Sequence, residues 1–276
     1  MFVNGAIEPH LLKEVLADGK GSIVKFGSRM RKDNTNLHMQ HLFVGSEGQL
    51  GVVTGLSMCA VPKPSCVQVA MLGVETYAGC CEILQLARRC LGEILSAFEF
   101  IDGSSMRCLE ENKKMRNVLT SNPPFNVLIE TMGSNEAHDK EKMDTFIEEA
   151  LSKGLAIDGV QAANAQEAGY MWKLRNILPI VALPDGFLCE HDAANAQEAG
   201  YMWKLRNILP IVALPDGFLC EHDVTLPLKH YYKIVEVLRE RLGSLATRVI
   251  SFGHMAEGDN HINISAKQYS PEFIAK

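Results

Sequence analysis

The sequence predicts an α+β protein, and three observations lead to this fold class. Short apolar runs alternate with longer segments in which apolar residues recur every three or four positions. Hydrophobic residues make up 47% of the chain and charged residues 22%, which is the balance of a globular protein with a buried core. Pro62 and Pro64 form a linker between two parts of unequal size. We therefore expect sheets with helices packed on them, divided into residues 1–63 and 64–276.

The pattern of residues 1–63 predicts the edge of a sheet. Two short apolar runs in residues 10–27 surround Asp18-Gly19 and predict a hairpin. A short helix or turn, the glycine-rich loop "GSEGQLG" at 45–51 and a strand are expected to follow. Exposed N–H groups of such a loop can contact phosphate or flavin carbonyls, although the spacing is not G-x-G-x-x-G. An ordinary glycine turn before a strand is the alternative.

Strands and helices alternate in the second part. The expected strands cover residues 66–74, 97–102, 125–131, 248–255 and 261–265. The expected helices cover residues 77–95, 104–119, a segment that runs to about Lys153 before Gly154, and 229–242 before Gly243. In each clear helix the apolar residues share one face, as Leu84, Ala87 and Leu91 do, and glycine follows the last turn of two of them.

A perfect tandem duplication interrupts this alternation. The 31 residues at 162–192, "AANAQEAGYMWKLRNILPIVALPDGFLCEHD", are repeated without change at 193–223. Stacking repeat proteins need several degenerate copies, so a recent in-frame duplication or an error in assembling the coding sequence is the favoured explanation over a doubled binding site. Each copy predicts a helix capped by Asn164 or Asn195, ended by Pro179 or Pro210, and then a strand. One copy is expected to fit the fold and the other to loop out.

Charge and composition exclude several classes of protein. The net charge of −6 argues against nucleic-acid binding, which needs a basic surface. No apolar run approaches the ~20 residues of a membrane span. The N-terminus shows no signal or transit peptide. The eight cysteines lack any C-x-x-C and are expected to be reduced thiols.

The stretch "GHMAEGDNHINI" at 253–264 holds two histidines, His254 and His261. A helix would separate them by about 10 Å along its axis, too far to share a metal. Gly253 and Gly258 favour a strand–turn–strand, which can bring the two rings together. Two imidazoles are only part of a zinc site, which takes three or four ligands. A partial metal site and ordinary loop histidines both remain possible on this motif alone.

The order of several motifs resembles one family. These motifs are "RKDNTNLHMQHLFVGSEGQLGVVT", "LGEILSAFEFID", "FNVLIETMGSNEAHDKEKM", "WKLR", "VTLPL" and "GHMAEGDNHINI". Together they are similar to the D-2-hydroxyacid dehydrogenases among the vanillyl-alcohol-oxidase-type flavoproteins. The resemblance implies that residues 1–63 are the C-terminal part of an FAD-binding domain and residues 64–276 a ferredoxin-like substrate domain.

The resemblance also implies a reaction. FAD would oxidise D-2-hydroxyglutarate to 2-oxoglutarate by accepting a hydride at N5, while a zinc-type divalent metal holds the 2-hydroxyacid. It implies the electron-transfer flavoprotein as electron acceptor and the mitochondrial matrix as location.

The resemblance assigns roles to individual residues. His254 and His261 match metal ligands, and Asn263 matches a residue that contacts the substrate. Arg206, or its copy Arg175, matches the arginine that binds the distal carboxylate. The flavin-contacting loop corresponds to Gly45, Ser46, Glu47, Gly48, Leu50 and Gly51.

The sequence also departs from the family pattern. Pro179 or Pro210 replaces a substrate-binding threonine. Glu190 or Glu221 replaces a lysine that helps bind the substrate carboxylate, and a glutamate there would repel a dicarboxylate. Glu257 and Asp259 differ from the family's aspartate and asparagine. No family precedent supports either as a metal ligand.

The family's third metal ligand, a glutamate, and its catalytic histidine are expected beyond Lys276, and the first half of the flavin domain before Met1. We therefore expect no catalytic residue in this chain. Two alternatives to D-2-hydroxyglutarate oxidation stay open: a catalytically inactive truncated fragment, and a dehydrogenase for a monocarboxylate such as D-lactate.

Overall fold

The computed structural model describes residues 9–16, 20–27, 30, 37–58, 62–180, 217–268 and 270–275. It divides into two compact units, Phe2–Lys63 and Pro64–Lys276. The fold class is α+β, as predicted. The identity of the first unit as part of a flavin domain stays a prediction.

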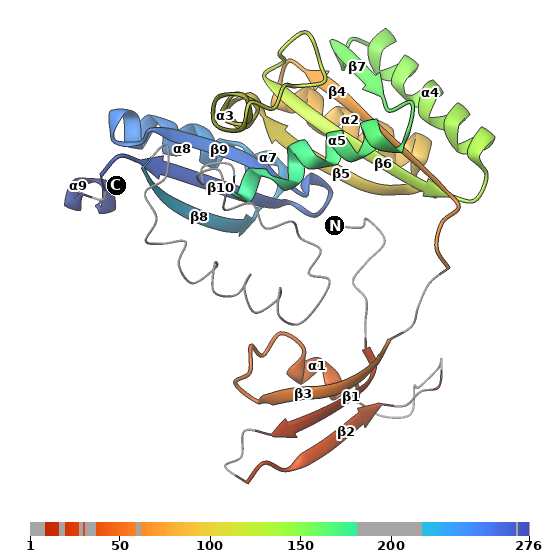
Figure 1. Ribbon diagram of the computed structural model, residues 1–276, viewed down its shortest axis with the longest axis vertical. Helices are drawn as coiled ribbons and strands as arrows, with labels where there is room; N and C mark the ends of the chain where they lie inside the picture. The colour runs from red at the N-terminus through yellow and green to blue at the C-terminus, as the bar shows by residue number, and fades with distance from the viewer. Residues whose placement is uncertain are drawn as a thin grey trace. The chain divides into compact units, whose positions relative to one another are not determined.

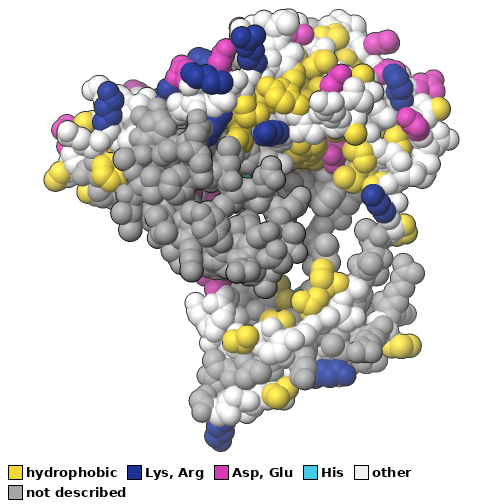
Figure 2. All heavy atoms as spheres, viewed as in Figure 1, with side chains coloured by type: hydrophobic (Ala, Val, Ile, Leu, Met, Phe, Trp, Pro, Cys, Tyr) yellow, Lys and Arg dark blue, Asp and Glu magenta, His cyan; other side chains and the backbone are white. Residues whose placement is uncertain are grey.

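The smaller unit is a three-stranded antiparallel sheet in the order β2-β1-β3 (Figure 1). Its strands are β1 (Pro9–Leu16), β2 (Ile23–Gly27) and β3 (Gly51–Met58), and a short helix α1 (Gln40–Phe43) precedes β3. Strands β1 and β2 pair antiparallel, as expected for the hairpin, although Asp18 and Gly19 lie outside the described residues. Figure 2 shows hydrophobic side chains on the surface of this unit; they include Ile23, Leu42, Val44, Leu50, Val52 and Leu56. Among the residues of this unit whose burial is described, which exclude β1, Gln40 and Gly51 are buried.

The larger unit is built on a seven-stranded sheet in the order β7-β4-β6-β5-β9-β10-β8. The strands are β4 (Cys66–Val74), β5 (Leu95–Asp102), β6 (Phe125–Gly133), β7 (Asp158–Gln161), β8 (Phe218–Thr225), β9 (Arg248–Gly253) and β10 (Asp259–Ala266). The first four strands follow the order 4-1-3-2 of a ferredoxin-like fold when they are numbered along the chain, and all of their pairs are antiparallel. Strand β9 extends this sheet by a short pairing with β5, which joins Phe100 to Gly253 and Ile101 to Phe252.

Helices cover both faces of this sheet (Figure 1). The described helices of this unit are α2 (Tyr77–Leu91), α3 (Gly103–Lys113), α4 (Glu136–Ser152), α5 (Ala165–Asn176), α7 (Leu228–Tyr231), α8 (Lys233–Leu242) and, after the last strand, α9 (Pro271–Ile274). Helices α3 and α5 pack on one face, where Met106 and Leu109 share a buried cluster with Met171 and Leu174. Because both faces are covered, every residue of β5 is buried, including Glu99.

Several elements differ from the sequence expectation, and the helix expected over 229–242 is divided into α7 and α8. The helix expected over 77–95 ends at Leu91, and Leu95 already belongs to β5. The helix expected over 104–119 covers only Gly103–Lys113, because Lys114 adopts the left-handed conformation (φ 54°) that ends a helix. Strand β7 was not expected, since "DGVQ" carries too few apolar residues for a period to be visible.

The described part of the duplication is divided between the copies. The first copy supplies α5, whose cap is Asn164 as expected: its side chain accepts a hydrogen bond from the backbone N–H of Glu167. The second copy supplies most of β8, from Phe218 to Asp223. Residues 181–216, with Asn195, Arg206 and Pro210, lie outside the described residues.

The six cysteines that the structure describes are free thiols, as expected; they are Cys66, Cys80, Cys81, Cys90, Cys108 and Cys220. Among the described helices, none combines the length and the apolar composition that a membrane crossing requires.

Candidate metal centre

A tight turn between β9 and β10 brings the two histidines of "GHMAEGDNHINI" together. Strand β9 ends at Gly253, a short 3-10 helix covers Met255–Glu257, and β10 begins at Asp259. The ring centroids of His254 and His261 are 5.3 Å apart with an interplanar angle of 85°. The expected strand–turn–strand is therefore confirmed.

The two glycines of this turn are required by its geometry. Gly258 has φ 76°, and a Cβ there would lie 2.5 Å from the carbonyl oxygen of Leu226. At Gly253, which has φ 154°, a Cβ would lie 2.4 Å from the carbonyl oxygen of Asp259. Only glycine combines a positive φ with such close backbone approach, so the two glycines fix the path that places both rings on one side.

Asp259 joins the two histidines. His254, Asp259 and His261 each offer a ligand atom, and the three atoms lie within 4.8 Å of one another. Two imidazoles and one carboxylate form a donor set that suits a zinc-type ion with an open coordination position. The residues present thus fit a divalent metal. Glu257, the other acidic residue of the turn, is exposed and is not part of this group.

Each histidine has a carboxylate at its Nδ1. His254 Nδ1 lies 2.8 Å from Glu99 Oε1, and His261 Nδ1 lies 2.5 Å from Asp223 Oδ1. A histidine ligand commonly donates one ring N–H to a carboxylate, which fixes its tautomer and directs the other nitrogen to the metal. Here this pattern assigns Nε2 of both rings to the metal.

Arg175 reaches the same site from α5. Its side chain is buried, its Nε donates to Glu99 Oε2 at 2.9 Å, and its Nη2 lies 3.2 Å from His254 Nε2. The guanidinium carbon lies 5.7 Å from the ring centroid of Phe252, within cation–π range. The structure therefore brings Arg175 to His254, while Arg206 lies outside the described residues and its role stays a prediction.

The charges of this cluster are unbalanced. Glu99 pairs with Arg175 and His254, whereas Asp223 and Asp259 lie beside His261, so three carboxylates accompany one guanidinium. Burial would raise the pKa of the Glu99 carboxyl, but the hydrogen bond with His254 and the charge of Arg175 lower it to about 2. A cluster with more acidic than basic side chains is suited to a divalent cation.

Asn263 and Glu221 lie beyond His261 on the same face of the sheet. They are paired in the register of β10 and β8, two residues along each strand from the pair His261 and Asp223. Asn263 is buried. The pKa of the Glu221 carboxyl is raised by burial and by the charge of Asp223, and His261 opposes this in part. Glu221 thus stands where the resemblance places a lysine, next to the residue expected to contact the substrate.

The glycine-rich loop belongs to the smaller unit. Gly45, Glu47 and Gly48 have positive φ, and a Cβ at either glycine would meet nothing within 4 Å. Ser46 N donates to the Phe43 carbonyl and Gln49 N to the Ser46 carbonyl, so the segment forms consecutive turns, while Leu50 is exposed and Gly51 begins β3. Such open backbone is compatible with the expected flavin contact, which stays a prediction.

Sequence reasoning missed Glu99 and Asp223. A signal for Glu99 was present, since a glutamate in the apolar strand "AFEFID" has to be buried and therefore paired. Asp223 carried no such signal, because an aspartate near the end of a strand is ordinary.

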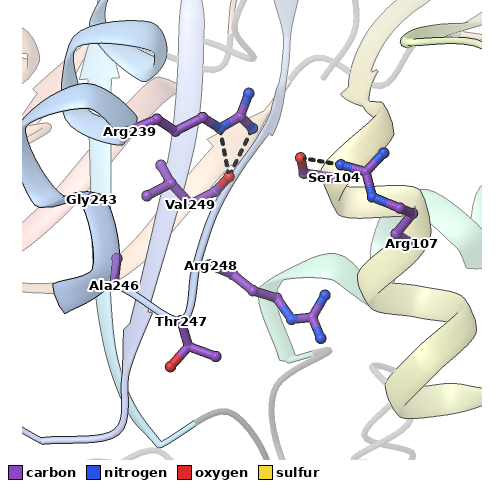
Figure 3. A pocket seen from close by; sticks show the side chains of 8 residues that line it. All are labelled: Ser104, Arg107, Arg239, Gly243, Ala246, Thr247, Arg248 and Val249. Carbon is purple, nitrogen blue, oxygen red and sulfur yellow. Dashed lines mark hydrogen bonds between the residues drawn. The ribbon is translucent and has the colours of Figure 1, made fainter.

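A cavity of about 280 Å³ on the larger unit is lined by three arginines (Figure 3). Arg239 donates to the Val249 carbonyl and to Asp102, Arg107 donates to Ser104, and Arg248 pairs with Glu111. Because each guanidinium already has a partner within the chain, this cavity is less suited to bind a ligand than the histidine cluster.

The family model described as "FAD linked oxidases, C-terminal domain" matches residues 63–188 and 185–276, and the two matches meet inside the duplicated segment. With a ferredoxin-like sheet and a histidine cluster at its extension, the chain belongs to this family of FAD-linked oxidases. Among curated relatives, a protein from Danio rerio and one from Arabidopsis thaliana, both named D-2-hydroxyglutarate dehydrogenase, mitochondrial, are each 36% identical to it. These alignments cover 96% and 98% of this chain but only 43% of each relative.

Solved structures agree on the fold. A p-cresol methylhydroxylase with substrate bound matches with a TM-score of 0.60 at 14% identity, over 97% of this chain and 53% of that protein.

Proposed function

We propose that this chain is part of an FAD-dependent dehydrogenase that oxidises D-2-hydroxyglutarate to 2-oxoglutarate at a divalent metal. The observation that carries this proposal is the cluster of His254, Asp259 and His261 within a chain of the FAD-linked oxidase family. The names of the relatives at 36% identity support the substrate, although the chain spans less than half of their length.

In this proposal His254 and His261 hold the metal through Nε2, and Asp259 is the third ligand. When bound, a divalent ion lowers the pKa of the substrate hydroxyl and positions the 2-hydroxyacid. Glu99 and Asp223 orient the two rings through Nδ1. Asn263 contacts the substrate from the neighbouring position of β10.

Of the two arginines proposed to bind the distal carboxylate, the structure describes Arg175. The Nε of Arg175 is paired with Glu99, so Arg175 would interact with a substrate through its Nη atoms, of which Nη2 lies 3.2 Å from His254 Nε2. FAD supplies the acceptor for the C2 hydride, and the loop Gly45–Gly51 is proposed to contact it. Delivery of electrons to the electron-transfer flavoprotein and location in the mitochondrial matrix are proposed from the resemblance and from the relatives' mitochondrial names.

A second candidate substrate is a monocarboxylate such as D-lactate. Glu221, in register with Asn263, favours it because a carboxylate at this place repels the distal carboxylate of 2-hydroxyglutarate. We place D-2-hydroxyglutarate first, because the relatives at 36% identity are named for it.

The test is the visible absorbance of the purified protein that contains this chain, loaded with FAD and Zn²⁺. Bleaching of the flavin bands by D-2-hydroxyglutarate, lost after chelation and restored by Zn²⁺, is the expected result. Faster bleaching by D-lactate, slowed by Glu221→Lys, would favour the monocarboxylate. Flavin that binds but is not bleached by either acid would support the alternative of a non-catalytic chain and contradict the proposed activity.

A further inference from the structure

The inference concerns Glu99 and rests on the metal centre proposed above. Glu99 lies in the middle of β5 with a side chain that is 0% exposed, more than 150 residues before His254 in the sequence. Its two carboxylate oxygens have different partners: Oε1 is 2.8 Å from His254 Nδ1, and Oε2 is 2.9 Å from Arg175 Nε. A fully buried carboxylate is costly unless it is paired in this way, so its placement indicates a specific task.

We propose that Glu99 is the positioning residue of the metal centre, holding His254 in the tautomer that binds the ion and shielding the ion from Arg175. The first half of this role follows from the bond at Nδ1. When Nδ1 carries the proton that the carboxylate accepts, Nε2 carries a lone pair and becomes the metal ligand. The rigid, buried strand β5 keeps the carboxylate in place, and with it the plane of the ring.

The second half follows from the position of Arg175. Its Nη2 lies 3.2 Å from His254 Nε2, the nitrogen assigned to the metal. An uncompensated guanidinium at this distance from a ligand atom would repel a divalent cation. The Glu99 carboxylate on Nε of the same guanidinium offsets this charge, so Arg175 can remain near the site without expelling the ion.

The other histidine provides an internal comparison. His261 also has a carboxylate at Nδ1, that of Asp223, but this side chain is 77% exposed. An exposed carboxylate competes with water and holds its partner less firmly. We expect Asp223 to contribute less than Glu99, although the two contacts look alike in distance.

The experiment measures Zn²⁺ affinity of the full chain by competition titration, without substrate or FAD. Glu99→Gln is expected to weaken binding about 10–100-fold, and Asp223→Asn by a few-fold at most. The ¹⁵N shifts of the His254 ring in the metal-free chain provide a readout that folding alone does not move. We expect the Nδ1–H tautomer to dominate in the wild type and to lose population in Glu99→Gln.

The double variant Glu99→Gln/Arg175→Met separates positioning from folding. It removes both charges of the buried pair, so no unpaired charge is left to destabilise the fold. We expect it to fold and still to bind Zn²⁺ weakly, because His254 has lost its carboxylate. Wild-type affinity together with an unchanged ring tautomer in the double variant would overturn the positioning role and leave only the shielding of the ion from Arg175.

Two other outcomes also test the role of Glu99 and the metal centre. Equal affinity of the wild type and Glu99→Gln would refute the inference while the proposed metal centre stands. A wild-type chain that binds no Zn²⁺, with His254→Ala as the matching blank, would refute the metal centre and the inference together.

Discussion

The two identical copies of the duplication contribute different elements to the described fold. From the first copy the structure describes α5, with Arg175 against Glu99. From the second it describes the part of β8 that contains Asp223, which contacts His261. Different parts of the repeated sequence, one from each copy, therefore bring a residue to His254 and to His261.

The two copies have the same sequence, so they can be distinguished only by the unique sequence to which each is connected. Each described part is the one that adjoins unique sequence: α5 follows β7, and β8 continues into Val224 and Thr225. Leu226 then donates its N–H to the carbonyl of Gly258 in the histidine turn. A short connection to a packed neighbour costs little loop entropy, which favours the part of each copy that adjoins unique sequence.

Substituting the two equivalent arginines is the strongest way to break this comparison. Arg175→Met is expected to lower the free energy of unfolding by about 3–5 kcal/mol, because Glu99 loses the guanidinium that pairs with it in the interior. Arg206→Met removes no contact of the described structure, and we expect a change within about 0.5 kcal/mol. Urea unfolding measures both.

The double arginine variant is the control. A small loss in Arg175→Met that grows large only when Arg206 is also replaced would show that the second copy can take the place of the first. Equal losses in the two single variants would likewise contradict the assignment of α5 to the first copy.

The pH dependence of stability sharpens the same comparison. The pKa of Glu99 is about 2 in the folded chain, below its ordinary value of 4.5, because His254 and Arg175 outweigh the effect of burial. A lowered folded pKa stabilises the fold above pH 4.5, and this contribution is lost as the pH falls from about 4.5 through about 2. Its size is on the order of 3 kcal/mol.

Unfolding of the metal-free chain at several pH values measures this contribution. The stability difference between the wild type and Glu99→Gln is expected to shrink as the pH falls through that window. The exposed Glu257→Gln is the control for loss of one carboxylate. A difference that stays constant down to pH 2 would argue against an ionised Glu99 beside Arg175.

Much of the larger unit could be predicted from the sequence, because its strands and helices have clear apolar periods. Strand β4 was expected at its observed bounds, and helix α8 ends at Gly243 as expected. Strand β7 was not expected, since pairing with β4 and not its own composition makes it a strand. The end of α3 at Lys114 could not be predicted either, because lysine has no preference for the left-handed conformation that ends the helix.

The candidate site could be predicted only in part. His254 and His261 lie within one short motif whose glycines indicate a turn, so their meeting was foreseeable. Their carboxylate partners come from β5 and β8, which only the sheet order places beside β9 and β10. Asp259 had no family precedent as a ligand, yet its place at the first residue of β10 puts it in the group.

The smallest effect is expected at the start of α5, where the cap residue of one copy can be compared with the same residue of the other copy. The side chain of Asn164 accepts a hydrogen bond from the backbone N–H of Glu167 at 3.0 Å, which caps the helix. Asn164→Ala is expected to cost about 1 kcal/mol, because one N–H of the first turn loses its partner. Asn195→Ala makes the same change in the second copy, and we expect it to cost less in the same urea titration. A larger loss at Asn195 would mean that the helix over the metal centre belongs to the second copy, and Arg206 would then replace Arg175 in every contact with Glu99 and His254.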